Sequence, residues 1–427
     1  MELPITKTDN WSFTGRILIR FFFIYFILYI FPFPLDLFSD NNYIVNSYHQ
    51  LWGKLVPFTG KHLLHIDVGT RGGDTLFQYT RIFTLVVIAV MGCLVLTIAD
   101  RKRSNYKTIF YLLTVYVRYF LAYNILDYGF AKIFHIQFMP MFPNLDQLVQ
   151  PYGDSSPQGL LWKFMGYSKS YQTFTGIGEV LAGLLLLFRR TTTLGALVSI
   201  ALLSNVVMMN WSYDIPVKVN SMHLLFMATF LLITDAKRTV NFFILNKPVL
   251  PVERRVLFTK KWIRVTSLIL KLFFVFYLIY VPFKQYSGYS KDWYSDKKPP
   301  LYGIYNIEIF VVNNDTLPPL TTDSIRWRRM IVEYPGMWAN IQLMNENLKT
   351  YDIKTDTIKK TAIISSGKDS LDKFIFRFNQ PAKDILTFKG QWKEDSVFIQ
   401  MKKVDINQFR LVQWKPRWIY RGGGSNY

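Results

Sequence analysis

The stretch TIFYLLTVYVRYFLAYNILDYGFAKI at residues 108–133 decides the fold class. It is long and mostly apolar, and a helix needs about 20 such residues to cross the hydrocarbon core of a bilayer. Similar runs flank it up to about residue 285 and become rare beyond that point. The sequence therefore predicts an α-helical polytopic membrane bundle of about seven spans. The predicted spans are residues 15–36, 76–99, 108–133, 171–189, 193–211, 217–234 and 262–283.

The composition agrees with a membrane protein. Of the 427 residues, 50% are hydrophobic and 17% are aromatic, and many aromatic residues lie at the ends of apolar runs, as in the aromatic belts of a bilayer interface. The net charge of +21 does not indicate a nucleic-acid partner, because the basic residues lie mainly in loops and in the C-terminal part, without an RNA-binding signature. Since basic loop residues beside spans contact anionic lipid, the expected partner is the lipid bilayer.

The loops between the runs alternate in charge. Loops 37–75 and 135–170 carry few basic residues, whereas the loops on the other side are rich in them, and the positive-inside rule places the basic loops in the cytoplasm. The N-terminus is then cytoplasmic, the first run is an uncleaved span, and residues 287–427 are periplasmic after an odd number of spans. We therefore expect a bacterial inner-membrane protein. The basic residues are Arg16, Arg20, Arg101, Lys102, Arg103, Lys107, Arg189, Arg190, Lys237, Arg238, Arg254, Arg255, Lys260, Lys261 and Arg264.

Residues 287–427 have a different pattern, in which short β-rich segments with alternating polarity are separated by turn residues. This spacing predicts an antiparallel β domain, and the strand count is similar to that of a lipocalin-like barrel. Such a barrel could enclose a binding cavity, or it could be packed with side chains and dock onto a partner. The segments are residues 304–312, 326–333, 338–344, 348–353, 358–364, 374–378, 385–392 and 396–402.

The same patterns predict the domain boundaries. Residues 1–107 form an N-terminal helical pair with a large outer loop, and residues 108–246 form the helical core. Residues 247–286 form a cytoplasmic loop and the last span, and residues 287–427 form the exported β domain.

Charged residues inside spans are costly and usually face the interior of a bundle. On a helix, Arg118 and Lys132 share one face of the third span, and Asp127 points nearly opposite. Glu179 lies in the fourth span, in one stripe with Gly176 and Gly183. Counting residues from the cytoplasmic ends places Arg118 and Glu179 at similar depth, which predicts an ion pair between them. The pair could fix helix registry, or it could form a proton or quinone-headgroup site.

A second polar cluster is predicted near the outer surface. Its carboxylate, ammonium and imidazole groups could exchange protons with a ligand that enters from the bilayer. The alternative is that these side chains are solvated in loops or extend to the interface. The cluster contains Asp127, Lys132, Asn210, Trp211, Tyr213, Asp214, Lys218 and His223.

No cofactor motif is present. His49, His62 and His65 match no closed set of metal ligands, so no metal site is predicted. Cys93 is the single cysteine, so the chain has no dithiol of its own for redox chemistry.

The region from Arg118 to about Asp235 resembles the DoxX-like membrane proteins of the DoxX/DoxD superfamily, as found in flavobacteria. The motifs behind this are RYFLAY at 118–123, YGFAK at 128–132, QPYGDSSP at 150–157 and NWSYDIPVK at 210–218, together with Gly176, Glu179, Gly183 and His223. DoxX relatives include a small membrane subunit linked to thiosulfate:quinone oxidation. The wider group is similar to the membrane bundle of vitamin K-dependent carboxylases, which pair a quinol site with an exported β domain.

The resemblance implies a quinone-linked accessory subunit of an envelope or redox complex. Quinone is then a possible cofactor of this chain, and a membrane or periplasmic protein is the expected partner. It transfers no catalytic residue, so the catalytic residues stay unknown and we expect no independent enzymatic activity. The alternative is a non-enzymatic scaffold or cargo-binding protein that presents a periplasmic β domain to a partner.

Overall fold

The computed structural model describes residues 11–38, 42–101, 103, 105–140, 142–249, 260–293, 298–333, 338–366, 373–392 and 394–413. These residues form two compact units. The first, here called the helical unit, is Met1–Met139 with Pro157–Ser290, and the second, the β unit, is Pro140–Ser156 with Lys291–Tyr427. The division near residue 290 lies close to the expected start of the β domain. The assignment of 140–156 to the β unit was not expected.

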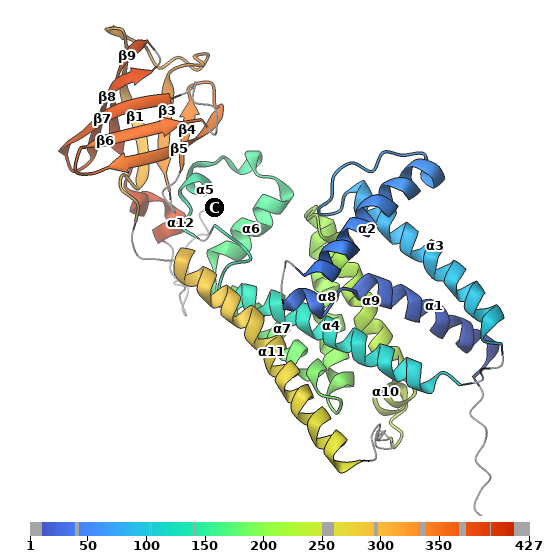
Figure 1. Ribbon diagram of the computed structural model, residues 1–427. Helices are drawn as coiled ribbons and strands as arrows, with labels where there is room; N and C mark the ends of the chain where they lie inside the picture. The colour runs from blue at the N-terminus through green and yellow to red at the C-terminus, as the bar shows by residue number, and fades with distance from the viewer. Residues whose placement is uncertain are drawn as a thin grey trace, which may run out of the picture. The chain divides into compact units, whose positions relative to one another are not determined.

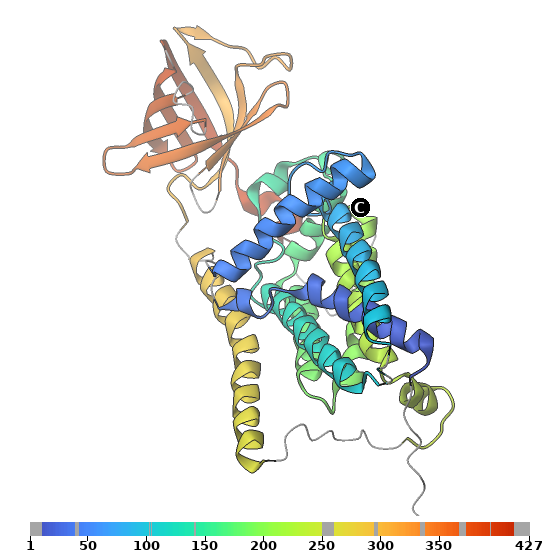
Figure 2. The same ribbon diagram turned by 45° about the vertical axis from the view of Figure 1, so that its right-hand side comes forward.

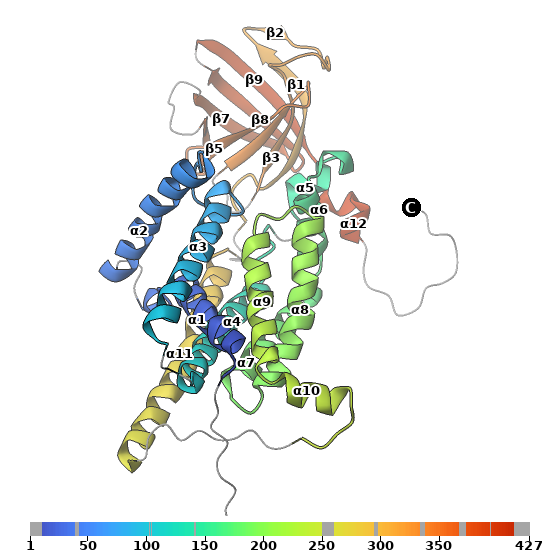
Figure 3. The same ribbon diagram turned by 90° about the vertical axis from the view of Figure 1, so that its right-hand side faces the viewer.

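The helical unit consists of helices that lie side by side (Figure 1). Figure 2 shows α1 against α3, and Figure 3 shows α8 and α9 as neighbours. The helices are α1 (Phe13–Ile30), α2 (Tyr43–Thr59), α3 (Leu76–Ala99), α4 (Lys107–Ile133), α6 (Pro157–Tyr167), α7 (Lys169–Leu187), α8 (Thr192–Ser212), α9 (Lys218–Ile233), α10 (Ala236–Phe243) and α11 (Lys261–Trp293).

Five of these helices are long and apolar enough to cross a membrane, which confirms the expectation of a helical part with candidate spans. The pair α9 and α10, bent by 77°, would add a sixth. Helix α7 occupies the predicted span 171–189 but is not among the five, because Gln172 and Glu179 lower its mean hydropathy. The total of about seven spans therefore stays a prediction. The candidate spans are Phe13–Leu37, Leu76–Ala99, Lys107–Ile133, Thr192–Ser212 and Lys261–Lys291.

Helix α2 lies within the predicted outer loop 37–75 and was missed. Its N-cap is Asn42, whose side chain accepts a hydrogen bond from the backbone N–H of Ile44. Val45, Trp52 and Val56 are buried and recur at helical spacing, so the signal was present in the sequence but was shorter than a membrane span.

Three glycines bring α4 and α7 into backbone contact. A Cβ atom on Gly176 would lie 2.7 Å from the carbonyl oxygen of Gly129, and one on Gly183 would lie 3.1 Å from the carbonyl oxygen of Ala122. Small residues at such positions allow close helix packing in membranes. The predicted small-residue stripe therefore forms the α4–α7 contact and fixes the register of the two helices.

The β unit contains an eight-stranded antiparallel barrel (Figure 1). The eight barrel strands pair in sequence order, and β1 closes the ring by pairing with β9, while β2 lies outside the ring beside β1. Each of the eight predicted segments forms one of these strands, and β2 is a two-residue extension beside β1. The strands are β1 (Gly303–Val312), β2 (Asp315–Thr316), β3 (Trp327–Val332), β4 (Trp338–Leu343), β5 (Leu348–Asp356), β6 (Thr361–Ser365), β7 (Lys373–Ala382), β8 (Ile385–Trp392) and β9 (Asp395–Lys403).

The barrel interior is filled with apolar side chains, of which Met330, Ile341, Phe376, Phe388 and Ile399 are fully buried. Apolar and polar residues alternate along each strand, and the apolar ones form this core because every second side chain points inward. This packing favours the second of the two alternatives, a barrel packed with side chains.

The segment 140–156 contributes the short helix α5 (Leu145–Val149) to the β unit. Leu145 is fully buried against Ile304 and Ile331 of the barrel. The carboxylate of Glu333 accepts hydrogen bonds from the backbone N–H of Leu145 at 2.8 Å and from the Asn144 side chain at 2.7 Å. The loop between α4 and α6 is therefore part of the β unit.

Candidate functional site

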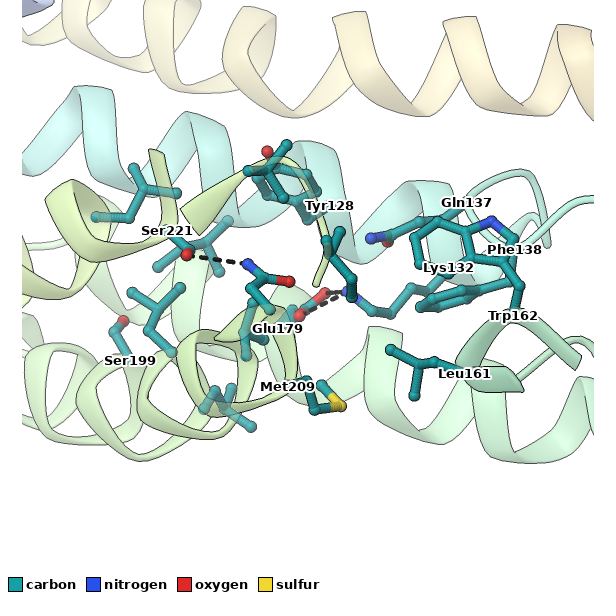
Figure 4. A pocket seen from close by; sticks show the side chains of 18 residues that line it. Tyr128, Lys132, Gln137, Phe138, Leu161, Trp162, Glu179, Ser199, Met209 and Ser221 are labelled. Carbon is teal, nitrogen blue, oxygen red and sulfur yellow. Dashed lines mark hydrogen bonds and ion pairs between the residues drawn. The ribbon is translucent and has the colours of Figure 1, made fainter. Parts of the chain in front are cut away.

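Lys132 and Glu179 form a buried ion pair between α4 and α7. The Lys132 ammonium donates to both carboxylate oxygens of Glu179, at 2.7 Å and 2.6 Å (Figure 4). Lys132 is 5% exposed and Glu179 is 8% exposed. Since a charge removed from water is expensive, each of these groups depends on the other.

The register of α4 and α7 explains this pairing. Glu179 lies between Gly176, which packs on Gly129, and Gly183, which packs on Ala122 and Leu126. Lys132 is three residues beyond Gly129, and helical side chains lean toward the N-terminus, so its ammonium extends back to the level of Glu179.

The ion pair lies in the wall of a cavity of about 80 Å³. The walls are mostly apolar, and the ring of Phe138 meets that of Trp162 edge to face at 5.2 Å (Figure 4). One water needs about 10–15 Å³ of such space, so the cavity can hold several waters or one small chemical group. The lining residues are Ile125, Tyr128, Lys132, Gln137, Phe138, Leu161, Trp162, Glu179, Ser199, Leu202, Leu203, Val206, Met209, Asn210, Ile215, Val217, Ser221 and Leu224.

Further polar groups surround the pair. The Asn210 side chain donates to the Ser221 hydroxyl at 2.9 Å, and the Asn220 side chain donates to the Tyr128 hydroxyl at 3.0 Å. The side-chain oxygen of Gln137 is buried and accepts no hydrogen bond from the described residues. A buried acceptor without a donor costs free energy, so Gln137 is available to a polar ligand in the cavity.

The predicted ion pair between Arg118 and Glu179 is wrong. Gly183 contacts Ala122, one turn from Arg118, so Arg118 lies about 12 Å along α4 from the level of Glu179. Its guanidinium donates instead to the Thr192 hydroxyl at 3.3 Å. Counting depth from each helix end failed because it ignored the register that the glycines impose.

The predicted outer cluster does not assemble as one site. Lys132 pairs with Glu179, and Asn210 lies in the same cavity wall. Asp127, on the opposite face of α4, accepts a hydrogen bond from the Tyr286 hydroxyl of α11 at 3.1 Å. These residues therefore have different partners, although they are near one another in the sequence.

The remaining members of that cluster lie elsewhere. Lys218 pairs with Asp214 at 2.6 Å, and the Asp214 side chain is 84% exposed, as expected for solvated residues. The His223 ring hydrogen-bonds to the Tyr25 hydroxyl at 2.6 Å and stacks on Tyr29 at 4.4 Å. Sequence reasoning missed these partners from α1, although Tyr25 and Tyr29 share a helix face.

Within the described ranges, no three His, Cys, Asp or Glu side chains lie close enough together to hold a metal ion.

Comparison with known proteins gives one curated relative. The chain is 36% identical to "Uncharacterized protein YwoB" of Bacillus subtilis over 128 residues, which are 30% of this chain and 79% of YwoB. No protein-family model matches the chain, and no solved structure matches it.

Proposed function

We propose that this chain, which belongs to the same family as YwoB, is a DoxX-like inner-membrane protein that serves as a quinone-linked accessory subunit of an envelope or redox complex. The observation that supports this most is the ion pair of Lys132 and Glu179 in the wall of a largely apolar cavity. An intramembrane ionisable pair that faces a cavity is a functional-site hypothesis by default.

The side chains around the cavity suit a quinone headgroup, and the cavity of about 80 Å³ has to widen to admit the ring, because benzene already occupies a cavity of about 150 Å³. Apolar and aromatic walls favour the ring, and the Lys132 ammonium can donate a hydrogen bond to a ring carbonyl oxygen. Glu179 can hold or release the proton that a quinone oxygen gains or loses. Reduction of a quinone takes up two electrons with two protons, and the electrons would come from a partner protein, because the chain offers Cys93 as its single thiol.

The proposed topology has seven spans, a cytoplasmic N-terminus and a periplasmic barrel of lipocalin-like type. The charge of the loops supports it, because the basic residues follow the positive-inside rule. Helix α7 would be one of the more polar spans, and it would be covered by the contact with α4 that the glycines allow.

The test is to purify the full chain in native lipid and measure extracted quinone by mass spectrometry. We expect quinone to co-purify with the wild type and to fall by about tenfold or more in Glu179→Gln, which removes the charge but keeps the size of the side chain. The matched control is Asp214→Asn, which neutralises a carboxylate whose side chain is 84% exposed and lies outside the cavity lining. A quinone content that is negligible in the wild type, or equal in both variants, would exclude the proposal.

A scaffold without redox chemistry is the second candidate, and the packed interior of the barrel favours it. Under this proposal the outer surface of the barrel binds a partner protein. Removal of residues 291–427 would then abolish partner co-purification while the helical unit stays inserted in the membrane.

A further inference from the structure

A second cleft of about 250 Å³ opens at the end of the helical unit where α4 begins, where α7 leads into α8 and where α9 ends. It shares no lining residue with the Lys132–Glu179 cavity. Cationic and hydroxyl side chains make up most of its polar lining. The lining residues are Lys107, Phe110, Tyr111, Thr114, Val115, Arg118, Arg189, Thr192, Thr193, Leu231, Thr234 and Asp235.

Arg118 lies in this cleft as a buried cation without a countercharge. It is 6% exposed, and its Nε atom is buried with no hydrogen-bond partner among the described residues. Its contacts are the neutral hydroxyl of Thr192 at 3.3 Å and the ring face of Tyr119 at 4.9 Å. No carboxylate in the described part of the chain pairs with it. A buried guanidinium in a membrane helix is costly unless an anion compensates it.

The neighbouring charges increase this cost. Arg189 lies in the same lining, with its guanidinium over the Tyr111 ring at 5.6 Å. Lys107 lines the cleft from the first residue of α4, and Lys271 of α11 is repelled by both Arg118 and Arg189. The cleft therefore concentrates positive charge around Arg118.

The carboxylate in the lining does not neutralise Arg118. Asp235 accepts hydrogen bonds from Arg238 at 3.1 Å and from the Thr193 hydroxyl at 2.6 Å. Arg238 of α10 supplies its countercharge, and Thr193 of α8 holds its carboxylate. Asp235 therefore does not serve as the countercharge of Arg118.

We propose that this cleft binds a phosphate group, with Arg118 and Arg189 as its ligands. A guanidinium offers a planar fork of donors that matches the oxygens of a phosphate. The Thr192 hydroxyl accepts from Arg118 and donates to the carbonyl oxygen of Phe188 at 3.0 Å, so it holds the guanidinium in place before the anion arrives. The phosphate can belong to a lipid headgroup or to a free phosphate ion. This site is independent of the quinone proposal, because it uses neither Lys132 nor Glu179.

The experiment has two arms, both with the full chain. In the first, inorganic phosphate is titrated into protein in dodecyl maltoside, a detergent without phosphate, and the thermal unfolding midpoint is recorded. In the second, protein is released from nanodiscs that contain phosphatidylglycerol and phosphatidylcholine, and retained lipid is counted by native mass spectrometry. The variants are Arg118→Gln and Arg189→Gln. The control is Arg264→Gln, which removes the same charge from an exposed position at the start of α11.

We expect phosphate, phosphatidylglycerol or both to bind to the wild type and to Arg264→Gln, and to bind about tenfold or more weakly to each cleft variant. A response to phosphate alone assigns the site to the free ion, and retained lipid assigns it to a headgroup. Arg189→Gln decides the outcome if Arg118→Gln does not fold, since Arg118 is the more buried of the two. Absence of binding in both arms, or equal binding in the cleft variants and the control, would overturn the proposal.

Discussion

Glu333, directly after strand β3, accepts a hydrogen bond from the backbone N–H of Leu145, a residue 188 positions earlier in the chain. The loop that contains Leu145 joins α4 to α6, and both of its flanks contribute cavity residues: Phe138 before it, and Leu161 and Trp162 after it. The chain therefore leads directly from the wall of the Lys132–Glu179 cavity into a segment held by the barrel.

Removal of the Glu333 carboxylate should weaken the β unit. In Glu333→Ala the buried N–H of Leu145 and the Asn144 amide lose their acceptor, which costs about 1–3 kcal/mol. Hydrogen exchange of residues 142–149 should accelerate, and chemical unfolding of the β unit should begin at lower denaturant. Glu308→Ala, at an exposed strand position, is the control and should change neither measurement. Equal exchange rates in both variants would contradict the assignment of this loop to the β unit.

The same residue should make stability depend on pH. Burial is the main cause that raises the pKa of Glu333 from 4.5 to about 7, and the nearby charge of Asp146 contributes to this rise. Between these two pKa values the folded state binds more protons than the unfolded state, so this contribution to stability is complete below about pH 4.5 and is lost as pH rises toward 7. The loss should amount to about 3 kcal/mol, from about 1.4 kcal/mol per unit of pKa.

Denaturant unfolding of the full chain from pH 4.5 to 8, monitored by tryptophan fluorescence, measures this slope. Glu333→Gln cannot titrate at this position and should flatten the curve. A slope that is unchanged in Glu333→Gln would assign the pH dependence to another group.

The sequence predicted those features that depend on local periodicity. Alternation of period two located all eight barrel strands, and helical spacing placed Arg118, Gly129 and Lys132 on the buried face of α4. The pairing of Glu179 depends on the register between two helices, which a single helix does not contain. The docking of Leu145 onto Ile304 and Ile331 depends on contacts that are distant in sequence, so no local pattern indicates it.

The close contact of α4 and α7 makes Gly176 sensitive to any side chain. In Gly176→Ala the new Cβ would lie 2.7 Å from the carbonyl oxygen of Gly129, so the helices must separate and the Lys132–Glu179 geometry must loosen. We expect a loss of about 1–3 kcal/mol, which is typical of overpacking. Thermal unfolding in detergent measures it. Gly178→Ala on the same helix is the matched control, because its Cβ would meet Leu202 at a normal 3.8 Å. Because Ala has a higher helix propensity than Gly, Gly178→Ala should be neutral or slightly stabilising, and equal destabilisation of both variants would contradict an origin in the interhelical contact.

Labelling of single cysteines tests the proposed topology. In a Cys93→Ser background, Asp214→Cys places a thiol between α8 and α9, Ile358→Cys places one between β5 and β6, and Arg264→Cys places one at the start of α11. An impermeant maleimide applied to spheroplasts should label the first two positions and should reach Arg264→Cys only after the membrane is opened. The reason is that the basic loops stay in the cytoplasm and α11 then carries the chain across the bilayer. Ile358 is 93% exposed, so a failure to label it in intact spheroplasts could not result from burial and would place the barrel on the cytoplasmic side. Labelling of Arg264→Cys in intact spheroplasts would likewise invert the orientation of the helical unit.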